Sequence, residues 1–119
     1  MKEIFIRPDS SIKDALRQLS KAGEKCLVVI GADKKVLGTL SDGDVRRAIL
    51  SGNKINEPIR EVFNKNSTCL VEGRFTREEL HEIFLKNRFD LIPVIDKSGK
   101  AVEILTWDEV FQRERDSEN

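Results

Sequence analysis

The stretch CLVVIGADKKVLGTLSDGDVRR, residues 26–47, returns in altered form as LIPVIDKSGKAVEILTWDEVFQ, residues 91–112. The two stretches align without a gap at an offset of 65 residues, and five of their 22 aligned pairs are identical. The identical pairs are Val29/Val94, Ile30/Ile95, Lys35/Lys100, Leu40/Leu105 and Val45/Val110. Self-similarity at a fixed offset indicates one supersecondary unit that is used twice.

Each copy predicts the same order of elements. A short β-prone run comes first, then a helix, then two apolar strands joined by a turn, and then a second helix. The runs cover 3–6 and 68–71, the first helices start near Ser11 and Thr76, the strands cover 26–30 and 36–41 with copies at 91–95 and 101–105, and the last helices start near Ser41 and Thr106. Because the strands are almost wholly apolar, we expect sheets that are covered on both faces. The chain is therefore predicted to be an α/β protein of two β-α-β-β-α units.

The spacing of apolar residues predicts which helix faces are buried. In the first unit the stripe is Ile12, Ala15, Leu16 and Leu19, and in the second it is Leu80, Ile83 and Phe84. The predicted boundaries are 1–54 for the first unit, 55–66 for a linker, 67–113 for the second unit and 114–119 for a charged tail. In the linker we expect a short helix with Asn56 as its cap and Pro58 at its first position.

Composition narrows the classes of partner. Lys+Arg and Asp+Glu both number 21 in the 119 residues, so the formal net charge is zero. A neutral protein has no broad field to attract nucleic acid or an anionic membrane. Since no apolar run approaches a membrane span and "MKEIFIRPD" lacks a signal-peptide core, we expect a cytoplasmic protein with nothing sizeable before its first strand.

Cysteine and histidine content points away from metal or nucleophilic chemistry. Cys26 and Cys69 lie in apolar surroundings and do not form a CxxC, so both are expected to be buried thiols inside strands. His81 has no neighbouring Cys or His with which to share a metal and is expected to be an ordinary helix residue. We therefore predict neither a metal site nor a catalytic residue.

A hydroxyl followed three residues later by a carboxylate is a helix capping box. The chain has four: Ser11/Asp14, Ser41/Asp44, Thr76/Glu79 and Thr106/Glu109. Because the spacing occurs four times, it is by itself a signal for the start of a helix. Ser41 and Asp44 are therefore either a helix cap alone or part of a ligand-binding site. A ligand is favoured there by the free amides of a helix start, by Gly38 and Gly43, and by Arg46 or Arg47, either of which offers a forked pair of donors to a phosphate.

The duplicated unit with GTLSDGD at the end of its third strand resembles a cystathionine-beta-synthase (CBS) domain pair, or Bateman module, over residues 3–112. Gly38, Ser41 and Asp44 match the three fixed positions of that family's nucleotide motif. The resemblance implies two repeats related by a pseudo-twofold axis, with a purine nucleotide such as AMP, ADP or ATP in the cleft between them. Ser41 would bind phosphate, Asp44 the ribose hydroxyls, and groups around Ile6, Cys26 and Leu27 the base.

The second copy departs from this motif, because Glu103 replaces the glycine and Glu109 the aspartate, whereas Thr106 keeps the hydroxyl. A second site with Thr106, Glu109 and Ile92 is therefore expected to be weaker. The resemblance further implies a homodimer and a regulatory module rather than an enzyme. The PIREVF linker and the VEILTWDEVF end are similar to CBS pairs of sugar-handling enzymes, above all sugar nucleotidyltransferases, whose catalytic domain would follow this chain. The alternative is a ligand-free dimerisation module whose motifs are only caps.

Overall fold

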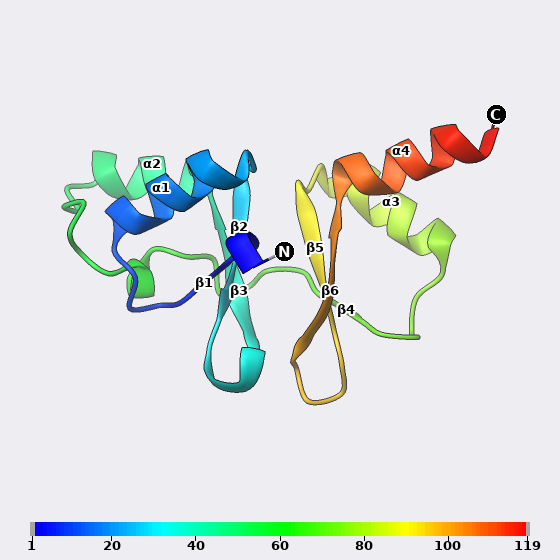
Figure 1. Cartoon of the computed structure of the whole chain (residues 1–119), viewed down its shortest axis with the longest axis horizontal. Helices are drawn as coiled ribbons and strands as arrows, with labels where there is room; N and C mark the ends of the chain where they lie inside the picture. The colour runs from blue at the N-terminus through cyan, green and yellow to red at the C-terminus, as the bar shows by residue number, and fades with distance from the viewer. Residues whose placement is uncertain (1, 119) are drawn as a thin grey trace. The chain divides into compact units, whose positions relative to one another are not determined.

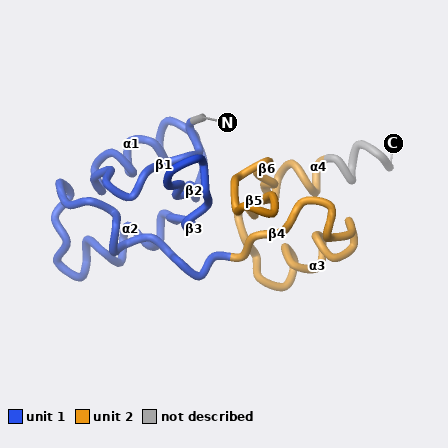
Figure 2. The backbone as a smooth tube through the Cα atoms, turned by 90° about the horizontal axis from the view of Figure 1, so that it is seen from below, with its two compact units in different colours: residues 1–67 blue, residues 68–119 orange. Residues whose placement is uncertain are grey.

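The computed structural model describes the backbone of residues 2–118 and the side chains of residues 3–112. The chain divides into two compact units, residues 1–67 and residues 68–119 (Figure 2). Each unit is described here by itself.

Unit 1 is a three-stranded sheet with two α-helices (Figure 1). In its sheet β2 is central, parallel to β1 and antiparallel to β3. Helices α1 and α2 lie side by side. The elements are a 3-10 helix η1 (Lys2–Ile4), β1 (Phe5–Ile6), α1 (Ile12–Ala22), β2 (Cys26–Ile30), a 3-10 turn η2 (Ala32–Lys34), β3 (Val36–Ser41), α2 (Asp42–Leu50) and a 3-10 helix η3 (Ile59–Glu61).

Unit 2 repeats this topology. Its elements are β4 (Leu70–Val71), α3 (Arg77–Asn87), β5 (Leu91–Ile95), β6 (Ala101–Thr106) and α4 (Trp107–Glu118), with β5 central in the sheet. Both sheets shift register at the same step of the repeat, between Val29 and Ile30 and between Val94 and Ile95. The predicted mixed α/β class with two like units is thus confirmed.

The cores follow the predicted stripes with one exception. Ile12, Ala15 and Leu19 of α1 are buried, and so are Leu80 and Phe84 of α3. All five residues of β2 are buried, as the apolar run predicts. Leu16, however, is 37% exposed. It lies at the margin of the stripe, where the curved helix surface turns toward solvent.

Three element predictions need correction. The first run is strand only at Phe5–Ile6, since residues 2–4 form η1. The second run is strand only at Leu70–Val71, so Cys69 precedes the strand and is half-buried. The linker helix is a single 3-10 turn that follows Pro58, and no side chain caps it, so the expected Asn56 cap is wrong. The tail predicted at 114–119 lies outside the residues whose side chains are described.

The linker packs into unit 1 instead of standing apart. Ile59 is fully buried in the same core as α1 and β2. Further on, Asn64 and Thr39 exchange two backbone hydrogen bonds, with N–O distances of 2.8 and 3.1 Å. The Thr39 and Ser67 hydroxyls are 2.6 Å apart. The linker therefore runs along the outer edge of β3, and its pairing with Thr39 lies two residues before Ser41.

Candidate functional site at the β3–α2 junction

The predicted motif lies where β3 ends and α2 begins. Strand β2 holds this junction from one side: Cys26 is the cross-strand partner of Ser41, and the Asp42 amide donates to the Lys25 carbonyl at 2.9 Å. Ser41 is the N-cap of α2 with an extended backbone, φ −92° and ψ 163°. The structure thus brings Cys26, Ser41 and Asp44 together at one end of the sheet.

Ser41 and Asp44 form a complete capping box. The Asp44 amide donates to Ser41 Oγ at 3.0 Å, and the Ser41 amide donates to Asp44 Oδ2 at 2.9 Å. These bonds use the hydroxyl oxygen as an acceptor and leave its proton available for donation. The second carboxylate oxygen, Oδ1, accepts from Arg47 Nη2 at 2.7 Å. The Gly43 amide has no partner among the described residues.

This arrangement retains the groups that an anionic, hydroxyl-bearing ligand requires. The helix start carries partial positive charge and a Gly43 amide without a partner in the described part of the chain, and the Ser41 hydroxyl retains its proton. Among the same residues, Asp44 Oδ1 is held only by the side chain of Arg47, which is 72% exposed. Asp44 itself is 17% exposed. A phosphate and a ribose diol fit these donors and this acceptor.

The structure explains why residue 38 is a glycine, which the sequence alone did not. A Cβ atom at this position would lie 2.1 Å from the Asn64 carbonyl oxygen and 2.9 Å from Phe63 Cδ2. The space that the glycine opens is therefore filled by the linker. Gly43 is different: a Cβ there would meet Arg47 Nη1 at 3.4 Å and Ser41 Oγ at 3.7 Å. Of the two glycines, Gly43 is the one that leaves room beside the helix start.

The remaining predicted residues of the first site divide into two groups. Ile6 and Leu27 are buried members of the unit 1 core, so only their backbone is available to a ligand. Cys26 is also buried. Arg46 is exposed and pairs with Asp42 at 3.1 Å, one helical turn away and outside the capping box.

The second unit places Thr106, Glu109 and Ile92 in the equivalent positions but bonds them differently. The Trp107 amide donates to the Asp90 carbonyl at 2.9 Å, as Asp42 does to Lys25. Thr106 Oγ1 accepts from the Glu109 amide at 3.2 Å and donates to Glu109 Oε1 at 2.9 Å. The longer glutamate reaches back to its own cap, so here the hydroxyl proton is already used. Ile92 is buried in the core of unit 2.

The four predicted capping boxes are therefore not equivalent. Those of α2 and α3 are complete. At α1 the Asp14 amide donates to Ser11 Oγ at 3.0 Å, but within the described residues no bond returns from the Ser11 amide to Asp14. At α4 the threonine hydroxyl donates to the glutamate, in addition to the bond from the Glu109 amide to the hydroxyl oxygen. The prediction of a reciprocal box is wrong for α1.

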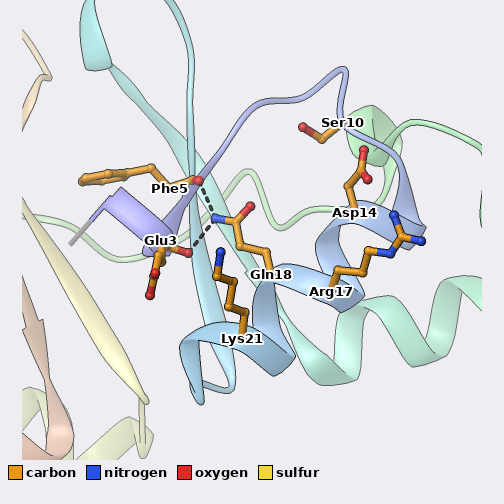
Figure 3. A pocket seen from close by; sticks show the side chains of 7 residues that line it. All are labelled: Glu3, Phe5, Ser10, Asp14, Arg17, Gln18 and Lys21. Carbon is orange, nitrogen blue, oxygen red and sulfur yellow. Dashed lines mark hydrogen bonds between the residues drawn. The ribbon is translucent and has the colours of Figure 1, made fainter.

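A surface cavity of about 510 Å³ lies elsewhere in unit 1, between the start of the chain and α1 (Figure 3). Across it Gln18 Nε2 donates to the carbonyl oxygens of Glu3 and Phe5, each at 2.6 Å. Its lining is Glu3, Phe5, Ser10, Asp14, Arg17, Gln18 and Lys21, none of which belongs to the predicted site.

Other reactive groups are not gathered into a site. In the described part of the chain, His, Cys, Asp and Glu side chains form no group of three that could hold a metal. Burial raises the pKa of the Cys69 thiol, which keeps it protonated. The His81 ring packs 5.4 Å from that of Phe111. No described helix combines the length and apolar character that crossing a bilayer requires.

Residues 1–51 match the family model of the CBS domain. The curated relatives include inosine-5'-monophosphate dehydrogenase of Aquifex aeolicus, 25% identical over 112 residues, which cover 94% of this chain and 22% of the relative. They also include arabinose 5-phosphate isomerase GutQ of Escherichia coli K12, 28% identical over 103 residues, which cover 87% of this chain and 32% of the relative. The chain thus spans a third or less of the length of these relatives.

Solved structures share the fold along nearly the whole chain. CBSX2, a protein of Arabidopsis thaliana, in complex with AMP has a TM-score of 0.83 at 21% identity, with 97% of this chain and 89% of that chain covered. The cytosolic domain of the Mg²⁺ channel MgtE in complex with ATP has a TM-score of 0.75 at 21% identity, with 92% and 44% covered. At these identities the likeness establishes the fold.

Proposed function

We propose that this chain is a CBS domain pair, a regulatory module, and that it senses a purine nucleotide at the β3–α2 junction of unit 1. AMP, ADP and ATP are the first candidates, because CBSX2 and the MgtE domain are structures in complex with AMP and ATP. In this proposal the Ser41 hydroxyl and the Gly43 amide face the phosphate, Asp44 faces the ribose, and the backbone around Cys26, Leu27 and Ile6 faces the base.

One observation carries the proposal. At Ser41 the hydroxyl proton remains available and Asp44 Oδ1 is held only by an exposed arginine, whereas at Thr106 the hydroxyl already donates to Glu109. A helix that needed only a cap would be served by either arrangement. The unit 1 junction keeps donors and an acceptor in reserve, so the unit 2 site with Thr106, Glu109 and Ile92 is proposed as the weaker one.

Calorimetric titration with AMP, ADP, ATP, GTP and S-adenosylmethionine tests the proposal. We expect binding of at least one purine nucleotide, and Asp44→Ala should weaken it by about ten- to a hundredfold, since a charge-assisted bond to the ribose contributes roughly 1.5–3 kcal/mol. Asp14→Ala is the matched control, because Asp14 occupies the same position in α1 with only the amide bond to its cap.

Two results would contradict the proposal. One is the absence of heat at millimolar ligand while circular dichroism shows an intact fold. The other is an unchanged affinity of Asp44→Ala, with a melting curve confirming that the variant is folded. Nucleotide-independent dimers in light scattering, combined with no thermal shift, would instead favour the ligand-free dimerisation module.

We also propose that the module is a homodimer that controls an attached or associated sugar-handling enzyme, with a sugar nucleotidyltransferase as the first candidate. The linker and C-terminal motifs support this class, as does the similarity to a sugar-phosphate isomerase, GutQ. The kinetics of the full-length protein with and without AMP test it: rates that do not respond to a nucleotide that binds would contradict it.

A further inference from the structure

We propose that Arg47 occupies the ribose-binding oxygen of Asp44 in the free protein and turns to the phosphate when a nucleotide binds. Arg47 would then be a positioning residue that makes the site select phosphorylated ligands over nucleosides. This inference rests on the proposed function and specifies its ligand chemistry.

The guanidinium of Arg47 lies across the first turn of α2. Its Nη2 is 2.7 Å from Asp44 Oδ1. Its Nη1 is 3.4 Å from the position that a Cβ on Gly43 would take, and its Cζ is 3.9 Å from it. One side chain thus lies against both the carboxylate oxygen that is not used by the cap and the side of Gly43 where a Cβ would be.

Arg47 belongs to the last turn of α2, and its side chain reaches back to the first turn to pair with Asp44. A cation that stays near the helix C-terminus would complement the helix dipole, so the charge of Asp44 is what holds the guanidinium near the N-terminus. The arginine side chain is 72% exposed, and exposed ion pairs contribute little to stability because solvent screens them. The pair is therefore easily opened, while the Ser41 amide continues to hold Oδ2 of Asp44.

Neither Arg46 nor unit 2 offers the same device. Arg46 pairs with Asp42, which is 53% exposed and lies outside the capping box. At an offset of 65 residues the counterpart of Arg47 is Gln112, which carries no charge. Among the described residues, the combination of a capping aspartate and an arginine on its second oxygen therefore belongs to the β3–α2 junction.

The exchange has opposite consequences for two ligands. An adenosine molecule must displace Arg47 from Asp44 and offers the guanidinium nothing in return. AMP displaces it equally but supplies a phosphate, whose oxygens match the forked donors of arginine. Arg47 therefore disfavours the nucleoside and favours the nucleotide.

Calorimetric titration of the full chain with AMP and with adenosine, for wild type and Arg47→Gln, tests the inference. Gln is the residue of the second repeat at this position, and it removes the charge and the forked donors while keeping a polar amide. We expect Arg47→Gln to bind AMP about tenfold more weakly. We also expect it to bind adenosine at least as tightly as wild type, so that the ratio of the two affinities falls. Arg46→Gln is the matched control and should leave the ratio unchanged.

The outcomes separate the two proposals. If wild type binds AMP but Arg47→Gln keeps the wild-type ratio of affinities, or loses both ligands equally while remaining folded, the role of Arg47 is overturned and nucleotide sensing stands. If Arg46→Gln lowers the ratio as much as Arg47→Gln, the effect arises from the loss of any positive charge near the site, and the inference fails as well. If wild type binds neither ligand, nucleotide sensing itself is overturned, and this inference with it.

Discussion

At the scale of single residues, Gly38 and Glu103 show how the same position of a repeat acquires different constraints. Gly38 is buried under the linker, with the Asn64 carbonyl where a Cβ would be. Glu103 is exposed, and β6 pairs with β5 but with no other segment among the described residues. The linker packs on β3 at Gly38, which requires a glycine there. Because no described segment packs on β6 at Glu103, a large side chain is tolerated at that position.

Gly38→Ala should destabilise unit 1 strongly. The added Cβ would meet a backbone carbonyl that is itself hydrogen-bonded to Thr39, so the linker must shift. We expect a loss of about 1–3 kcal/mol or more in the free energy of unfolding, measured by urea denaturation. The matched control is Gly43→Ala, where only the flexible end of Arg47 is near and little change is expected. Equal stability of Gly38→Ala and wild type would show that the linker does not pack there as described.

At the scale of elements, identical local signals end in different hydrogen-bond networks. The αL residue that ends the first helix of each unit is Gly23 in one and Arg88 in the other, with φ of 67° and 54°. The turns between the two long strands differ as well. In unit 1 the turn has Asp33 and Lys34 at positive φ, whereas in unit 2 Asp96 accepts hydrogen bonds from Ser98 and Lys100.

The Asp96 turn gives the β5–β6 hairpin a pH-dependent stability. Hydrogen bonds from the Ser98 hydroxyl and then from the Lys100 amide lower the pKa of the Asp96 carboxyl below its ordinary value. A carboxyl whose pKa is lower in the folded state stabilises above its unfolded pKa, and this stabilisation is lost as pH falls through the folded pKa. Wild type should therefore exceed Asp96→Asn in urea midpoint at neutral pH, and the difference should shrink below about pH 4.

An NMR titration of the Asp96 carboxyl measures the same effect directly. Ser98→Ala removes the strongest of these bonds and should move the pKa of Asp96 back toward its ordinary value. A midpoint difference between wild type and Asp96→Asn that does not change with pH would exclude the carboxylate as its cause.

At the scale of the whole molecule, the two units share one topology but differ in the hydrogen bonds at the cap of their last α-helix. Strand order and register shift are the same, yet Ser41 keeps its hydroxyl proton available, whereas the Thr106 hydroxyl donates to Glu109. A ligand that binds only the folded state stabilises it by about 2.7 kcal/mol at a hundred times its Kd. Hydrogen exchange with saturating AMP should therefore slow mainly at the β3–α2 junction of unit 1. Stronger protection around Thr106 than around Ser41 would show that the ligand binds unit 2, which contradicts the proposal.

Much of this protein was determined by its sequence alone. Periodicity and the repeat predicted the long strands, the starts of all four α-helices and the mixed α/β class, because these depend on local spacing and on which face is apolar. Ser41 and Asp44 were found by a motif whose members lie within one helical turn, where spacing in sequence is spacing in space.

Only the tertiary structure decided the rest. The packing of the linker on β3, the use of Gly38 for that contact and the choice of Arg47 over Arg46 beside Asp44 depend on where distant segments or freely rotating side chains come to lie. No local pattern encodes them, because a linker residue such as Asn64 pairs across 25 positions with Thr39 and a guanidinium has several carboxylates within its reach. Packing selects among such partners, and it did so differently in the two copies of one repeat.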